Sequence, residues 1–259
     1  MNRIEQLFIE KSKQGKKALV TYTVAGDPTI KKSKKVLEQL ITSGADIIEI
    51  GIPFSDPMSE GPVIQKAHER SLKNQTNLDL ILKISSELRL KDEKVPIVLM
   101  GYMNSFLSMG KQLYKNLSKA GIDGIIVVDL PYDESHAFFS KLKEFHIDLI
   151  RLISPTTDDV RLKNMLSSSS GYLYYVSLKG ITGSKIKNFS EVQNRVKKIK
   201  SLTDLPVVVG FGIKDTLTAK KMSSFSDGIV VGSKIVELVE KNSTTKINQL
   251  TRSLKRAID

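Results

Sequence analysis

Two acidic residues, Glu49 and Glu60, are the strongest candidates for chemistry in this chain of 259 residues. Glu49 lies within an apolar run of strand type, 47–52, whose composition is typical of a parallel strand covered on both faces. A lone carboxylate is costly to bury there unless it is paired or protonated. Glu60 follows on the loop that leaves this strand. One acid on a strand and another on the next loop is a typical acid/base placement at the mouth of an α/β barrel.

Each acid also has a structural explanation that the residues alone leave open. Side chains alternate along a strand, so Glu49 points away from both neighbouring isoleucines, either into a barrel or toward the helices. Inside a barrel its pKa would rise, which suits general acid/base work. The alternative is a structural ion pair, for instance with Arg151, the basic residue of the predicted fifth strand. Glu60, as a loop residue, could simply be a solvated surface acid.

Apolar, β-branched runs alternate with charged helical segments along the whole chain, which predicts parallel βαβ units. Eight runs in a chain of this length favour a closed barrel over an open sheet. The first strand is followed by no Gly-x-Gly-x-x-Gly, the fingerprint of a dinucleotide-binding fold. The predicted strands are Ala18–Val24, Ile47–Gly51, Pro96–Met100, Gly124–Val128, Leu149–Ile153, Tyr172–Ser177, Pro206–Gly210 and Gly228–Val231.

The expected fold is therefore an α/β (β/α)8 TIM barrel with extra helices at the N-terminus and after strand 2. The extra helix after strand 2 is predicted from Gly61 to Leu72, and one long C-terminal helix from about Lys234. No linker or shift in composition divides the chain, so residues 1–259 are expected to form a single domain. The helices expected between strands are Ile30–Ser43, Asn77–Leu90, Gly110–Ala120, Glu134–Phe145, Asp158–Leu166, Glu191–Ser201 and Leu217–Ser224.

Glycine-bearing turns end the last three predicted strands. Glycine permits close backbone approach, and the amides at a helix N-terminus hold a phosphate dianion. Barrels of this kind build their phosphate site after strands seven and eight. The three turns together therefore predict a phosphate ester as ligand, and the polar segment from 178 to Phe189 is long enough to be a lid. The turns are Gly180-Ile-Thr-Gly183, Gly210-Phe-Gly-Ile213 and Gly232-Ser233.

Apolar and aromatic residues also gather at the predicted strand ends, where they could line a pocket for a flat ring or simply fill the core. They are Tyr22, Met100, Tyr174 and Phe211. The three histidines, His68, His136 and His146, lie in predicted helices or connections and are expected at the surface. A metal site is therefore not expected.

Composition excludes several classes of protein. The chain has no cysteine, which rules out disulfides and thiolate catalysis and fits a cytoplasmic location. It has no apolar run long enough for a membrane span and no signal peptide is expected. The net charge of +12 comes from lysines spread over several helices without an interleaved aromatic platform. Solvated helix faces explain this charge better than a nucleic-acid surface.

The region around the two acids resembles the tryptophan synthase α family. It reads Glu-x-Gly-x-Pro-Phe-Ser-Asp-Pro at 49–57, followed by Gly-Pro-x-Ile-Gln at 61–65. The resemblance extends over nearly the whole chain, from Tyr22-Thr-Val-Ala-Gly-Asp-Pro28 to Gly232-Ser-x-Ile-Val236. It implies a lyase of L-tryptophan biosynthesis that cleaves indole-3-glycerol phosphate to indole and glyceraldehyde 3-phosphate by a retro-aldol reaction.

The resemblance also implies roles for single residues. Glu49 matches the family's proton-transfer group and Glu60 its second catalytic acid, while Thr182 matches a lid threonine that contacts this second acid. The residues implied to hold the substrate are Tyr22, Met100, Tyr174 and Phe211 around the indole ring, and Gly183, Gly212, Ile213, Gly232 and Ser233 around the phosphate.

A tryptophan synthase β chain is the implied partner, in an α2β2 heterotetramer, with Pro53, Asp56 and Asn104 near the contact. No cofactor or metal is expected in this chain, whereas pyridoxal phosphate is expected in the β chain. The chain departs from the family at two places: Glu60 replaces an aspartate, and Leu178 stands where arginine is common. Two rival functions therefore remain, a stand-alone lyase and a catalytically weak α subunit that mainly activates its partner.

Overall fold

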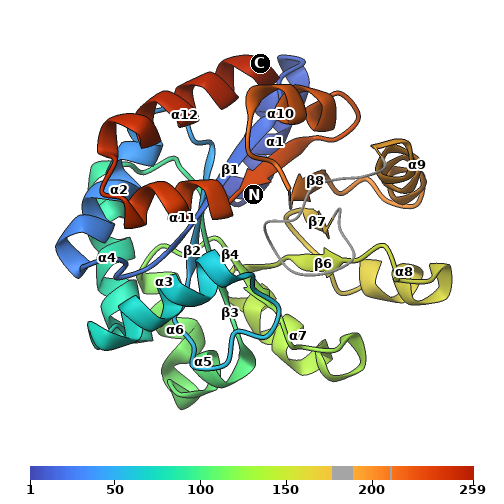
Figure 1. Ribbon diagram of the computed structural model, residues 1–259. Helices are drawn as coiled ribbons and strands as arrows, with labels where there is room; N and C mark the ends of the chain where they lie inside the picture. Colours follow the sequence, from blue (N-terminus) through green and yellow to red (C-terminus); the bar gives the residue numbers. More distant parts are fainter. Residues whose placement is uncertain (177–188, 211) are drawn as a thin grey trace.

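The computed structural model describes residues 1–176, 189–210 and 212–259, and in it parallel strands form a barrel with helices arranged around it (Figure 1). The order of the strands is β5-β4-β3-β2-β1-β9-β8-β7-β6, and every pair is parallel. The strands are β1 (Ala18–Val24), β2 (Ile47–Gly51), β3 (Ile97–Gly101), β4 (Gly124–Val127), β5 (Asp148–Leu149), β6 (Arg151–Ile153), β7 (Leu173–Val176), β8 (Val207–Gly210) and β9 (Gly228–Val231).

Strands β5 and β6 are two pieces of one run, and they close the ring. β5 pairs with β4, and β6 pairs with β7. Ile150, between the two pieces, still donates its N–H to the carbonyl of Ile125 at 2.9 Å. The predicted eight-stranded TIM barrel is therefore confirmed, with its fifth strand divided at one residue.

The predicted helices between strands are found, with their ends shifted by one or two residues in most cases. The main helices are α1 (Arg3–Lys13), α2 (Ile30–Thr42), α3 (Pro62–Lys73), α4 (Leu78–Lys91), α6 (Leu113–Lys119), α7 (His136–Glu144), α8 (Asp159–Leu166), α9 (Phe189–Lys200) and α10 (Thr216–Ser223). A short helix that the sequence did not predict, α5 (Met103–Leu107), follows β3. The extra helices at the N-terminus and after strand 2 are α1 and α3.

The prediction of one long C-terminal helix is wrong. The segment forms two helices, α11 (Ser233–Glu240) and α12 (Thr244–Ile258). Asn242, between them, has φ of 51°, a left-handed conformation that asparagine tolerates and that ends a helix. The apolar spacing on either side of this turn is helical, so the periodicity alone did not reveal the break.

Alternation along the strands divides the buried side chains into two layers. Ile48 and Ile50 of β2 belong to the layer between strands and helices, whereas Ile47 belongs to the interior of the barrel. Tyr22 and Val98, on the two strands that flank β2, also lie in the interior. The interior is therefore a packed core, as is usual for this fold.

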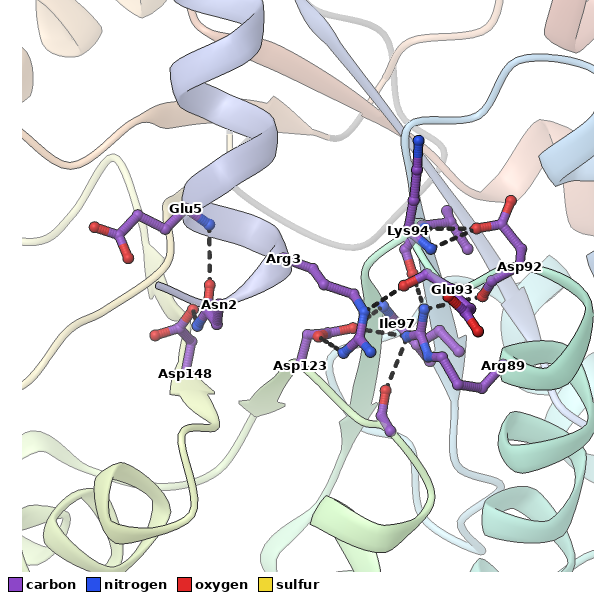
Figure 2. A network of polar contacts seen from close by, with 12 residues as sticks. Asn2, Arg3, Glu5, Arg89, Asp92, Glu93, Lys94, Ile97, Asp123 and Asp148 are labelled. Carbon is purple, nitrogen blue, oxygen red and sulfur yellow. Dashed lines mark hydrogen bonds and ion pairs between the residues drawn. The ribbon is translucent and has the colours of Figure 1, made fainter.

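Helix α1 closes the amino end of the barrel. Its apolar face places Ile4 and Phe8 in the interior layer, where Phe8 contacts Tyr172 with ring centroids 5.7 Å apart. At the start of the helix, Asn2 donates a hydrogen bond to the carboxylate of Asp148, and Arg3 binds Asp123 at 2.9 Å (Figure 2). Because α1 fills this end, the interior of the barrel is closed to a ligand here, and the carboxyl ends of the strands are left as the open side among the described residues.

Asp123 is the centre of the polar network at this closed end (Figure 2). Its side chain is 3% exposed and accepts from Arg3 and Arg89, each at 2.9 Å, and from the backbone N–H of Ile97 at 2.8 Å. Arg89 in turn donates to the carbonyls of Val95 and Gly121. The network ties α1, α4 and the starts of β3 and β4 together.

Replacing Asp123 should therefore destabilise the fold without touching the open end of the barrel. We expect Asp123→Ala to lower the free energy of unfolding by about 3–5 kcal/mol, because it leaves the partly buried guanidinium of Arg89 without its counter-charge. Urea denaturation followed by circular dichroism measures the change. The matched control is Asp133→Ala, an exposed aspartate, which should stay within about 0.5 kcal/mol of wild type.

Candidate active site

Glu49 points into the barrel. It lies on the same face of β2 as Ile47 and is paired in register with Tyr22 on β1 and Val98 on β3, both of the interior layer. The residue is 1% exposed. The alternative of a structural ion pair with Arg151 is wrong, since that guanidinium bonds instead to Ser168 and to the carbonyl of Leu130.

The surroundings of Glu49 favour its protonated form. Burial raises the pKa of this carboxyl to about 8, and the nearby charge of Glu60 adds to the rise. Within the part of the chain that the structure describes, its Oε2 atom has no hydrogen-bond partner. A buried carboxyl with a raised pKa and an unused oxygen is what a general acid/base requires.

Glu60 is also buried, although it lies on the loop between β2 and α3. It is 3% exposed, so the interpretation of a solvated loop acid is wrong. The loop folds back over the barrel mouth: the Glu60 N–H donates to the carbonyl of Pro57 at 3.0 Å, and the Glu60 carbonyl accepts from Gln65 at 2.9 Å. Burial raises the pKa of its carboxyl to about 7.

Both acids line one pocket at the carboxyl ends of the strands, with about 470 Å³ of empty space that is partly open to solvent. The structure brings together nine of the residues predicted for the site: Tyr22, Glu49, Glu60, Met100, Tyr174, Gly212, Ile213, Gly232 and Ser233. Three further lining residues were not predicted, namely Ile64, Lys214 and Val230. Thr182, Gly183 and Phe211, together with Leu178 and the predicted lid up to residue 188, lie outside the described residues.

The glycine turns form one wall of this pocket. Gly212 has φ of 76°, a left-handed conformation that favours glycine. Gly232 precedes α11, so the first amides of that helix face the pocket beside Ser233. Lys214, two residues after Gly212, is exposed and adds a cation to the same wall. The wall thus combines the first amides of a helix with a positive charge, which is suited to an anion.

The loop that carries Glu60 is held by two side chains that the sequence did not single out for this purpose. Tyr102 accepts the N–H of Ser59 at 3.2 Å through its hydroxyl and stacks on Phe54, with ring centroids 4.7 Å apart. His68 accepts the N–H of Phe54 at 3.0 Å. The prediction of a surface position is wrong for His68, which is 3% exposed, whereas His136 and His146 are exposed. Its i, i+4 spacing from Ile64 on the buried face of α3 could have revealed it.

Comparison with known proteins decides the family. The family model described as tryptophan synthase alpha chain matches residues 8–258. The tryptophan synthase alpha chain of Marinobacter nauticus is 41% identical, over 100% of this chain and 98% of its own. The tryptophan synthase alpha chain of Burkholderia thailandensis is 40% identical, over 100% of this chain and 97% of its own.

The chain belongs to the tryptophan synthase alpha chain family. Solved structures agree: the alpha subunit from Legionella pneumophila superposes with a TM-score of 0.92 at 36% identity, over 100% of this chain and 99% of that one. A chain of the aminoacrylate-bound tryptophan synthase from M. tuberculosis gives 0.91 at 27% identity, over 100% of both. Membership makes the chain an enzyme of tryptophan synthesis, and a subunit for which a beta chain is the partner.

The residues matched to the family's partner contact differ in exposure. Asp56 is exposed on the loop after β2 and Asn104 is exposed on the short helix α5, whereas Pro53 is buried within this chain. Two large apolar side chains on the same segments are exposed as well, Met58 at 74% and Leu107 at 56%. Exposed apolar side chains rimmed by polar ones are typical of a contact surface.

Neither a membrane span nor a metal centre is found in the described ranges. Their helices are all too short or too polar to cross a bilayer. The same residues contain no group of three histidine, aspartate or glutamate side chains that could hold a metal ion.

The raised pKa of Glu49 predicts how stability depends on pH. The folded chain holds this proton up to about pH 8, whereas an unfolded glutamate releases it near pH 4.5. Between these values the folded state binds more protons, so the carboxyl destabilises the fold increasingly as pH rises. We expect Glu49→Gln to gain roughly 2 kcal/mol or more over wild type between pH 5 and pH 9.

Urea denaturation of both proteins across this range measures the difference. Glu134→Gln, which changes an exposed acid, is the control and should run parallel to wild type. A Glu49→Gln curve that also ran parallel would mean that Glu49 is ionised in the folded protein at neutral pH.

Proposed function

We propose that the chain cleaves indole-3-glycerol phosphate to indole and glyceraldehyde 3-phosphate by a retro-aldol reaction. The observation that carries this proposal is the pairing of two buried carboxyls, Glu49 and Glu60, in one pocket whose far wall is suited to a phosphate. Family membership supports the choice of substrate.

The two acids have separate tasks because their protons are held differently. The indole ring must gain a proton at C3, the glycerol C3′ hydroxyl must lose one, and positive charge that builds at the ring N–H needs an anion. Glu49, with its pKa of about 8, holds a proton at neutral pH and can donate it to C3; its carboxylate then takes the proton of the C3′ hydroxyl as the bond between C3 and C3′ breaks. Glu60, with the lower pKa of about 7, ionises first and can accept the ring N–H.

The rest of the pocket fits the two ends of the substrate. The phosphate binds the amides of Gly212, Ile213, Gly232 and Ser233, and Lys214 adds an opposite charge. Tyr22, Met100 and Tyr174 surround the indole. Thr182, Gly183 and Phe211 remain proposed substrate contacts on the strength of the family pattern. No metal or organic cofactor takes part in these steps.

We further propose that the product passes to a beta chain that carries pyridoxal phosphate, in an α2β2 complex. The docking face is the rim with Asp56 and Asn104, where the exposed Met58 and Leu107 supply apolar area. Asp56 and Met58 of this rim lie on the same loop as Glu60, so docking can influence the position of the second acid.

Indole release from indole-3-glycerol phosphate, measured with and without the beta chain of the same organism, tests the function. Glu49→Gln should fold and bind the beta chain but lose at least about 100-fold in kcat, because it can no longer transfer a proton. Glu134→Gln is the matched control. No indole from wild type in either condition would refute the lyase, and full activity without any complex would favour a stand-alone enzyme.

Variants of Glu60 separate charge from length. Glu60→Ala should lose about 100-fold or more in kcat, as expected for removal of a preorganised electrostatic partner. Glu60→Asp keeps the charge one methylene farther from the substrate and should stay within about tenfold of wild type, a change of about 1.4 kcal/mol or less. If Glu60→Asp instead gained a hundredfold, the wild-type chain would be a weakened enzyme that mainly activates its partner.

A further inference from the structure

A chain of contacts runs from the Glu60 loop, through a buried histidine, to a tyrosine of the pocket. His68 lies on α3 with its ring between Phe54 and Tyr22. Its Nδ1 accepts the backbone N–H of Phe54 at 3.0 Å, and its Nε2 lies 3.5 Å from the hydroxyl of Tyr22. None of the tasks assigned to the two acids uses His68.

The first of these contacts fixes the proton on the imidazole. A backbone N–H can only donate, so Nδ1 must be the unprotonated nitrogen. Burial lowers the pKa of His68 to about 4, so the ring is neutral and carries one proton. That proton is therefore on Nε2, which faces the hydroxyl of Tyr22 and can only donate to it.

The direction of the next hydrogen bond follows. If the Tyr22 oxygen accepts from His68, its own proton is left to be donated elsewhere. Tyr22 is the neighbour of Glu49 across β1 and β2 and lines the pocket with Glu60. Burial raises the pKa of Tyr22, and the charges of Glu60 and Glu49 add to the rise.

The backbone beside the hydroxyl is shaped to leave it room. A Cβ at Gly51, the last residue of β2, would lie 2.3 Å from the Tyr22 oxygen. The hydroxyl therefore occupies space at the carboxyl end of β2 that any other residue at position 51 would take. It lies between this strand and His68, in the pocket that both acids line.

We propose that His68 is a positioning residue for the lyase reaction, and that it turns the hydroxyl of Tyr22 into a hydrogen-bond donor directed at Glu49 and Glu60. The inference rests on the proposed function and adds to it one hydrogen-bond donor for the two acids, the Tyr22 hydroxyl. Tyr22 stabilises the ionised form of the acid pair during turnover, and His68 acts only through Tyr22. A purely structural role, in which His68 anchors the loop at Phe54, is the alternative.

Two substitutions of His68 separate these roles. Asparagine places an oxygen where Nδ1 was and keeps the bond to Phe54, but it is too short to donate to Tyr22. Glutamine reaches the position of Nε2 with a donor. The anchoring role predicts that His68→Asn behaves as wild type, whereas the positioning role predicts that His68→Gln is the milder change.

The assay is indole release by the complex with the beta chain, as a function of pH, for wild type, Tyr22→Phe, His68→Asn, His68→Gln and the double variant Tyr22→Phe/His68→Asn. We expect Tyr22→Phe and His68→Asn each to lower kcat about tenfold or more, the loss of a hydrogen bond to a charged group, with KM changed less than about threefold. The acid limb of the profile should move up by about one pH unit, because the ionised acids lose a donor.

The double variant should be no worse than the poorer single variant, since both remove the same bond. His146→Asn is the matched control, because His146 is exposed and asparagine tolerates its left-handed φ of 58°. Thermal melts identify any variant that fails to fold. Activity and pH profile like wild type in His68→Asn would overturn the proposal and leave only the anchoring role.

Nitrogen NMR of the histidine rings gives a readout that does not depend on activity. The ring signal that disappears in His68→Asn is that of His68. In wild type this signal should show the tautomer with the proton on Nε2, and in Tyr22→Phe its chemical shift should change. A proton on Nδ1 would overturn the proposal whatever the kinetics show. Failure of the proposed function looks different, because wild type itself would then release no indole.

Discussion

A carboxyl group inside an apolar barrel is the constraint on which this structure depends. Glu49 is placed among the interior side chains with one oxygen unpartnered in the described structure, and that arrangement is more stable when the group keeps its proton than when it is ionised. Glu60 is subject to the same condition on the loop above. A second buried carboxyl raises the pKa of the first, so the two acids differ in proton affinity although they are the same residue type.

The remaining elements maintain these surroundings. Helix α1 fills the closed end with Ile4 and Phe8, which keeps water from reaching the acids from below. At the open end, Tyr102 and His68 hold the loop over Glu60. Backbone amides at the glycine turns are the hydrogen-bond donors proposed for the phosphate, so few charged side chains have to be buried to bind it.

The sequence was sufficient to predict the fold and most of the pocket, because these follow from periodicity and from turns at strand ends. From the alternation of side chains, Glu49 had to lie on the face of β2 opposite Ile48 and Ile50. Only the structure showed that this face is the interior of the barrel. Burial of Glu60 and His68 was not predictable in the same way, since it depends on how one loop folds back over the barrel. Lys214 was missed because a surface lysine carries no signal of its own, and its sequence does not show that its side chain lines the pocket.

The two ends of the chain are joined through a single aspartate. Asp46, at the start of β2, binds Lys11 of α1 at 2.6 Å and Lys255 of α12 at 2.7 Å, and Lys255 also pairs with Asp259 at 2.9 Å. Both termini are thereby held at the amino end of the barrel, on the side away from the pocket. An affinity tag, fluorophore or surface tether attached at either terminus would leave the pocket entrance and the rim around Asp56 unobstructed. The chain can therefore be immobilised through a terminus while the pocket stays accessible to solvent.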